Sequence, residues 1–154
     1  MALSAKKREL IERIGVHFEN KGMQPLFGRI LGLMLLHERA EVTFEEIVEE
    51  LNVSKSAVSN ALTYLQAVNK IVYHTKPGDR KRYFHLPIKD FCQEMEKEMM
   101  EIVKVEEVLE EVLVERGDKN HEFNCGLVDF LDFIKFFKKE IPGIFEKYRM
   151  QKSK

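Results

Sequence analysis

The sequence has 154 residues, of which 44% are hydrophobic and 33% are charged, and its formal net charge is -1. This length suits one compact domain, or a small domain with a helical extension, and it argues against two unrelated domains. The charge is unevenly placed, because residues 52–86 have a net charge of +5 and residues 87–154 of -4, so a basic surface is confined to the middle of the chain.

The two cysteines, Cys92 and Cys125, have no repeated spacing, which favours reduced thiols over a disulfide framework or a zinc knuckle. The N-terminus "MALSAKKREL" reaches charged residues at once, unlike a signal peptide. The longest apolar stretch, residues 30–36, is far shorter than the ~20 residues that span a bilayer. We therefore expect a soluble, cytoplasmic protein that has no membrane partner.

Two helices are predicted first. Apolar residues recur at helical spacing in the first segment, which predicts an amphipathic helix from about Ser4 to Lys21. The next segment, "PLFGRILGLMLL", is apolar nearly all round, so we expect it to be the central packing helix. Gly28 and Gly32, four residues apart, would let another backbone approach closely.

A helix-turn-helix follows. In "TFEEIVEEL" Thr43 precedes Glu46 by three residues, which is a capping-box pattern at a helix start. Asn52 tolerates the left-handed conformation that ends a helix, and Ser54 can cap the next one. A helix, a tight turn and a second helix within about 22 residues form this motif.

The second of these helices is nearly uncharged, because Lys55 is the one charged residue in "NVSKSAVSNALTYLQAVN". One face is apolar and consists of Val58, Ala61, Leu62 and Leu65. The opposite face has small hydrogen-bonding side chains, Ser56, Ser59, Asn60 and Thr63, which can donate to and accept from base edges. The alternative is an ordinary surface helix that happens to have few charged residues.

A β-hairpin is predicted next, because "IVYHTK" and "KRYFHL" are β-branched and aromatic runs on either side of the turn sequence "PGDR". Helix-turn-helix followed by hairpin is the order of a winged helix. Its tip is basic, and Arg80 could enter a minor groove. The residues expected to hold phosphates are Ser54, Lys55, Lys76, Arg80, Lys81 and Arg82.

A long helix is predicted from Pro87 to about Arg116, with a broad apolar stripe at heptad spacing. Since the stripe is wider than a two-stranded seam, we expect it to pack against more than one helix of a partner subunit. The residues expected in this homodimer interface are Leu10, Ile14, Phe18, Met95, Met99, Ile102, Leu109 and Leu113.

A final helical segment follows Gly117, and Pro142 is expected to start a further turn. Its phenylalanines at positions 123, 130, 133, 136, 137 and 145 are interpreted as core. The competing interpretation is an aromatic pocket for a small effector, in which ring faces could attract a quaternary ammonium ion.

The sequence gives little support for catalysis. The sequence has no G-x-S-x-G elbow, Gly-rich phosphate loop or His-Glu-x-x-His pattern. His121 and Cys125 are four residues apart and could share a metal, but two ligands do not make a site. We therefore predict no enzyme activity, no metal and no cofactor, and treat a small metal-dependent enzyme as a third hypothesis.

At "GRILGLMLL", "VSKSAVSNAL" and "KPGDRKRYF" the chain resembles the GbsR-like branch of the MarR superfamily of winged-helix transcriptional regulators, over about residues 8–86. The resemblance implies a homodimer, a roughly palindromic operator and control by a small effector. In well-known members that control concerns choline and glycine betaine. Thr63 stands where relatives often have a basic residue, and Asn69 where a glycine is usual.

By this resemblance, two groups of residues match the family's DNA-binding positions. The recognition-helix start is matched by Ser54, Lys55, Val58 and Ser59. The wing is matched by Pro77, Gly78, Asp79, Arg80 and Lys81.

The predicted fold is mainly α with a small β-hairpin: a winged helix-turn-helix with N- and C-terminal dimerisation helices. We expect a dimerisation helix at 1–21, the DNA-binding domain at 22–86 and a helical dimerisation region, which could also hold an effector, at 87–154. The predicted function is sequence-specific binding of double-stranded DNA by a homodimeric repressor. The alternative is a winged-helix protein-interaction module that does not read DNA.

Overall fold

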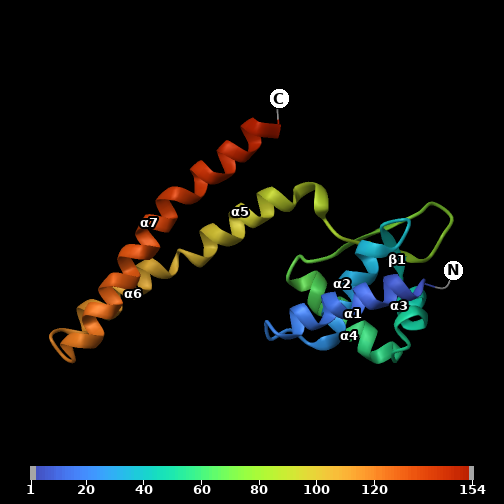
Figure 1. Ribbon diagram of the computed structural model, residues 1–154, viewed down its shortest axis with the longest axis horizontal. Coiled ribbons are helices and arrows are strands. Elements are labelled where there is room, and N and C mark those ends of the chain that lie inside the picture. The colour runs from blue at the N-terminus through green and yellow to red at the C-terminus, as the bar shows by residue number, and fades with distance from the viewer. Residues whose placement is uncertain (1–2, 153–154) are drawn as a thin grey trace. The chain divides into compact units, whose positions relative to one another are not determined.

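The computed structural model describes residues 3–152, and contacts between residues divide the chain into two units after Ile88. The first unit contains helices α1–α4 and three strands, and the second contains α5, α6 and α7 (Figure 1). This is the mainly helical architecture with a small antiparallel sheet that the sequence predicts. None of the described helices is long and apolar enough to cross a membrane.

Helices α1 (Ala5–Glu19) and α2 (Pro25–Leu36) pack closely against each other. The Ser4 hydroxyl caps α1 by accepting a hydrogen bond from the Lys7 backbone N–H. Both predicted helices are confirmed, although α1 ends two residues before Lys21. The predicted role of α2 as the central packing helix is also confirmed, since seven of its residues are buried.

The close approach of α1 and α2 depends on glycine. A Cβ atom added at Gly28 would lie 2.9 Å from the Cα of Gly15 and 2.9 Å from the Cβ of Phe18. Both neighbours are fixed by the α1 backbone, so neither can move aside cheaply. At Gly32 the nearest atom would be the Cα of Ile11 at 3.3 Å. Gly28 and Gly32, which were predicted to allow a close helix approach, therefore lie where α1 and α2 are in contact.

Residues from every helix of the first unit share one hydrophobic core with the sheet. Its fully buried centre includes Ile30 and Leu33 of α2, together with side chains from later elements. These side chains are Val42, Ile47, Val58, Leu65 and Ile71, and Phe84 of the sheet is buried beside them. The helix-turn-helix and the hairpin are thus held by one core rather than by separate ones.

The sheet has three antiparallel strands in the order β1-β3-β2, where the sequence predicted two. Strands β2 (Val72–Thr75) and β3 (Arg82–His85) form the expected hairpin. The additional strand, β1 (Glu41–Thr43), pairs with β3. Three residues are too few to show a period-two pattern, which explains why sequence analysis missed β1.

The helix-turn-helix consists of α3 (Phe44–Leu51) and α4 (Lys55–Ala67). The predicted capping box is present: the Glu46 N–H donates to the Thr43 hydroxyl, and the Thr43 N–H donates to the Glu46 carboxylate at 2.7 Å. Arg39 also pairs with this carboxylate. Burial raises the pKa of Glu46, but the donors around it outweigh burial, so the net shift is downward.

The second unit corrects two sequence predictions about helices. The helix expected from Pro87 to Arg116 is a short 3-10 turn, then α5 (Phe91–Ile102) and α6 (Val105–Arg116). At the break, Val103 is completely buried among side chains of α7, whereas Ile102 is 65% exposed. Because of the break, the β-branched side chain of Val103 points into the hydrophobic core of this unit.

The other correction concerns Pro142, which does not begin a new element. Helix α7 (His121–Lys152) runs through it. A proline inside a helix costs about 3 kcal/mol because it removes one hydrogen bond and crowds the preceding turn. Ile141 and Phe145 on either side are buried in the core of the second unit, so their burial offsets that cost.

We expect Gly28→Ala to destabilise the first unit by about 1–3 kcal/mol, because the added methyl group meets backbone on α1. Chemical denaturation monitored by circular dichroism would measure the change. Gly126→Ala is the control, since a Cβ at this helical position meets nothing within 4 Å. It should be neutral or raise stability by about 0.5–1 kcal/mol. Equal effects of the two substitutions would contradict the close-packing argument.

Candidate nucleic-acid interface

The turn between α3 and α4 has the predicted geometry. Asn52 adopts the left-handed conformation with φ 51°, and Val53 packs against the core. Ser54 then caps α4, because its Oγ accepts a hydrogen bond from the Ala57 N–H at 3.2 Å. The orientation of α4 is therefore set by backbone geometry on one side and by an apolar contact on the other.

Helix α4 has the two faces that the sequence predicts. Its four apolar residues, Val58, Ala61, Leu62 and Leu65, are at most 3% exposed. The four proposed base-reading residues, Ser56, Ser59, Asn60 and Thr63, are all exposed. An uncharged polar surface of one helix therefore faces away from the core.

The polar residues of α4 differ in their hydrogen bonds. The Thr63 hydroxyl donates to the Ser59 backbone carbonyl at 2.9 Å, and the Ser56 hydroxyl lies 3.2 Å from that of Ser54. The side chains of Ser59 and Asn60 make no hydrogen bond with any other residue in the described part of the chain. These two side chains therefore keep their full hydrogen-bonding capacity for an external partner.

The hairpin tip is a type II β-turn. The Asp79 N–H donates to the Lys76 carbonyl at 3.0 Å, and Gly78 at the third position has φ 79°. Pro77 supplies the fixed φ that the second position of such a turn favours. The sequence "KPGD" therefore specifies both the turn and the point at which Arg80 leaves it.

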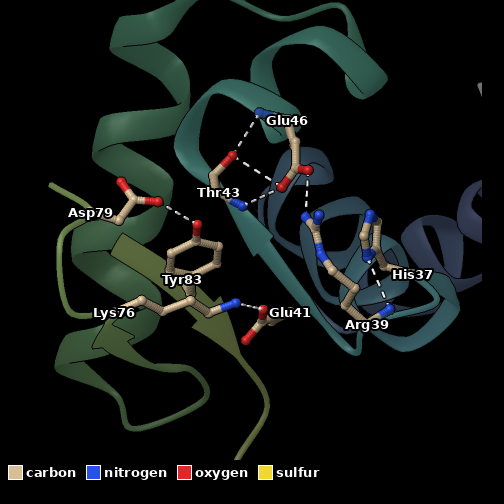
Figure 2. Close-up of polar contacts among 8 residues, drawn as sticks. All are labelled: His37, Arg39, Glu41, Thr43, Glu46, Lys76, Asp79 and Tyr83. Carbon is tan, nitrogen blue, oxygen red and sulfur yellow. Dashed lines mark hydrogen bonds and ion pairs between the residues drawn. The ribbon is translucent and has the colours of Figure 1, made fainter. Parts of the chain in front are cut away.

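The acid in this basic hairpin has a structural role. The Asp79 carboxylate accepts a hydrogen bond of 2.6 Å from the Tyr83 hydroxyl (Figure 2). It also accepts one of 2.9 Å from the Lys81 N–H. These two hydrogen bonds lower the pKa of Asp79, and the first also raises the pKa of Tyr83. The carboxylate thus stays charged while its oxygens are bound within the wing.

The predicted phosphate-holding residues fall into two groups. Lys55, Arg80, Lys81 and Arg82 are exposed, and the structure shows no ion pair for any of them among residues 3–152. The guanidinium of Arg82 lies 4.7 Å from the centre of the Tyr73 ring. Lys76 differs, because its ammonium group pairs with Glu41 of β1 (Figure 2).

Sequence reasoning missed Glu41. The partners are 35 residues apart, and the strand that carries Glu41 is too short to be recognised from its pattern. The hydrogen bond from Lys76 and the charges of Lys76 and His74 lower the pKa of Glu41. Basic residues that are neighbours in sequence are therefore not equivalent in the structure.

The proposed dimer residues of α1 are partly occupied within the chain. Leu10, Ile14 and Phe18 are half-buried, and Ile14 and Phe18 lie beside the glycines of α2.

In the second unit, α5 and α6 pack along α7 (Figure 1). Met95 and Met99 are half-buried against its core, and Leu109 and Leu113 are also half-buried. Ile102 is exposed. The proposed dimer residues therefore border the apolar surface of this unit instead of forming it alone.

The interpretation of the C-terminal phenylalanines as core is wrong for most of them. Phe145 is buried and Phe137 is half-buried. Four others, Phe123, Phe130, Phe133 and Phe136, are between 48% and 61% exposed. Three helices cannot enclose a helix face of this width, so α7 presents an uncovered aromatic surface.

The metal hypothesis has no geometric support in the described residues. Cys125 Sγ lies 3.5 Å from His121 Nε2 on an exposed turn of α7. No group of three or more His, Cys, Asp or Glu residues in the described chain is arranged to hold a metal ion. A hydrogen bond between neighbours on one helix accounts for this pair.

Comparisons with known proteins agree with this geometry. A model of the MarR family matches residues 21–82. The HTH-type transcriptional regulator MmpR5 of Mycobacterium tuberculosis is 22% identical over 140 residues, which make up 91% of this chain and 85% of that protein. The crystal structure of a transcriptional regulator has the same fold, with a TM-score of 0.77, 21% identity, and coverage of 94% of this chain and 99% of that chain. Residues 21–82 are therefore similar to the MarR family, and the fold of the chain is that of a solved transcriptional regulator.

Proposed function

We propose that this protein is a cytoplasmic, sequence-specific DNA-binding transcriptional regulator, and that it acts as a homodimeric repressor on an inverted-repeat operator. The observation that carries the proposal is the combination of an exposed, uncharged polar face on α4 with a wing in which the side chains of Arg80, Lys81 and Arg82 form no ion pair among residues 3–152. The first feature suits base edges, and the second suits phosphates.

In this proposal α4 lies in the major groove. Asn60 is long enough to make two hydrogen bonds with an adenine edge, and Ser59 can donate or accept. Thr63 contributes an acceptor atom, since its hydroxyl already donates to the Ser59 carbonyl, and Ser56 contributes a hydroxyl that also contacts Ser54. The wing holds the phosphate backbone beside the groove, and Arg80 at its tip is placed to enter the minor groove.

A homodimer would place two copies of α4 about 34 Å apart, which is one turn of DNA. The apolar surface of the second unit supports this assembly, because isolated chains rarely expose so many large aromatic residues on one helix. Exposed aromatic side chains of this kind are typical of an interface between subunits.

We place the chain in the GbsR-like branch because of the segments "VSKSAVSNAL" and "KPGDRKRYF". A small effector would act by binding the DNA-competent and incompetent dimers with unequal affinity. The aromatic surface of α7 is the place where such an effector could bind, next to the interface.

The first prediction concerns phosphate contacts. Arg80→Gln with Lys81→Gln should lower the magnitude of the slope of log affinity against log salt by about 1.8, which corresponds to two lost contacts. Fluorescence anisotropy with labelled duplex at several salt concentrations measures this slope. The control, Lys139→Gln with Lys147→Gln, removes two exposed charges from α7 and should leave the slope unchanged. A winged helix that docks on protein alone would show no salt-dependent binding to duplex.

The second prediction concerns base reading. Asn60→Ala should weaken binding to the preferred site by about 1–3 kcal/mol and relax the base preference at one position of each half-site. The salt slope should not change, because no phosphate contact is lost. Selection from random duplexes gives the base preference, and Gln93→Ala removes an exposed amide from α5 as the control. An unaltered preference would exclude Asn60 from base reading.

The third prediction concerns the dimer. Ile102→Lys should raise the dimer dissociation constant on the order of tenfold or more, because it places an unpaired charge in the apolar interface. Glu115→Lys, at an exposed position of α6, should have little effect. Sedimentation equilibrium distinguishes the two variants. A wild-type protein that is monomeric at micromolar concentration would refute the assembly.

A further inference from the structure

The outward face of the three-stranded sheet carries a polar cluster that the DNA-binding proposal does not use. Strand pairing places Glu41 opposite His85, and Tyr83 opposite both Thr43 and His74. Because residues paired across strands project from the same face, these side chains lie together on one side. Val42 and Phe84 project from the other side into the core. We define the wing cluster as Glu41, His74, Lys76 and Tyr83.

Within the wing cluster, the ammonium group of Lys76 is held from two directions. It donates a hydrogen bond to Glu41 Oε1, and it lies 3.8 Å from the centre of the Tyr83 ring (Figure 2). The ring is itself fixed, because its hydroxyl donates to Asp79 and the His74 ring stacks on it with centroids 5.7 Å apart. A cation between a carboxylate and a ring face has favourable contacts with both.

Glu41 has little contact with solvent. Its side chain is only 13% exposed, whereas that of Lys76 is 43% exposed. A carboxylate this far from water needs a cation to compensate its lost hydration. His74 Nε2 also lies 3.2 Å from Glu41 Oε2, but Lys76 is the partner that donates a hydrogen bond to this carboxylate. Moving Lys76 to a phosphate would leave Glu41 poorly compensated.

The other basic side chains of the wing have no such restraint. Arg80 and Lys81 follow the turn and are exposed, and their side chains form no ion pair among residues 3–152. Arg82 lies over the Tyr73 ring on the other face of the sheet and forms no ion pair among residues 3–152. A phosphate can therefore bind these three groups without breaking an internal ion pair.

We propose that Glu41 is a positioning residue of the wing that keeps Lys76 bound to the protein, so that DNA phosphates are contacted by Arg80, Lys81 and Arg82 and not by Lys76. This inference rests on the proposed DNA binding. It changes the role of Lys76 from a phosphate ligand to a brace between β1 and the hairpin. Glu41 thereby limits the sequence-independent part of the affinity, which grows with each phosphate contact.

The brace also connects the wing to the helix-turn-helix. β1 ends at Thr43, which is the N-cap of α3, and Thr43 pairs with Tyr83 in the sheet. Two polar contacts therefore extend from β1, the capping box to α3 and the Glu41 pair to the wing (Figure 2). The position of the phosphate-binding groups relative to α4 depends on this strand.

Three variants of the full-length chain test the proposal: Glu41→Gln, Lys76→Met and the double variant. Each is titrated with one labelled duplex between 50 and 200 mM salt. Glu41→Gln releases Lys76, so the salt slope should become steeper by about 0.9. Across this fourfold range of salt, the affinity should then fall about 3.5-fold more than for the wild type. Lys76→Met should have the wild-type slope, because it removes no phosphate contact.

The double variant is the matched control, since it has the same net charge as the wild type. Its slope should return to the wild-type value if the gain in Glu41→Gln comes from Lys76. A slope that falls by about 0.9 in Lys76→Met would overturn the proposal, because Lys76 would then contact a phosphate. An unchanged slope in Glu41→Gln, with or without weaker binding, would also overturn it and leave Glu41 a purely structural residue.

A measurement without DNA separates this inference from the proposed function. Carbon-detected NMR titration of the Glu41 carboxylate should give a pKa below the ordinary glutamate value in the wild type and a higher one in Lys76→Met. Absence of salt-dependent duplex binding by the wild type would refute the proposed function, and the inference about phosphates with it. An unchanged Glu41 pKa in Lys76→Met would refute the ion pair itself.

Discussion

The pairing of β1 with β3 is the constraint on which the arrangement of the wing depends. A two-stranded hairpin is barely stable by itself in water, and β2 is exposed along its whole length. β3 is therefore held from its other edge by β1, and Phe84 in β3 is buried beside Val42. Because β1 leads directly into α3, three paired residues place the hairpin relative to the helix-turn-helix.

Much of the first unit could be predicted because its signals are local. The capping box at Thr43, the left-handed Asn52 and the turn at Gly78 each involve residues within three or four positions of one another. Local backbone preferences of this kind act before any tertiary contact forms. The two faces of α4 followed from periodicity alone. Glu41 could not be found in this way, because its partner Lys76 is distant in sequence and the pairing exists only once the sheet has formed.

The second unit shows a different limit of sequence reasoning. Apolar spacing identified helical segments, but it could not show that Val103 turns inward and interrupts the pattern. Nor could it show that Phe133 and Phe136 remain uncovered. Hydrophobic periodicity reports that a residue needs burial, and it does not report whether the covering surface comes from the same chain. For α7 the structure leaves Phe133 and Phe136 exposed to solvent.

Charge in the wing illustrates why a count along the sequence is a poor measure of electrostatic potential. Both acids near the hairpin are bound internally: Asp79 accepts from Tyr83 and Lys81, and Glu41 accepts from Lys76. Asp79 lies in the basic segment and lowers its formal charge, yet its oxygens are turned toward the protein. Glu41 lies outside that segment and yet cancels one of its bases. The field that a phosphate meets is therefore dominated by the groups left without partners, and their number is decided by tertiary structure rather than by composition.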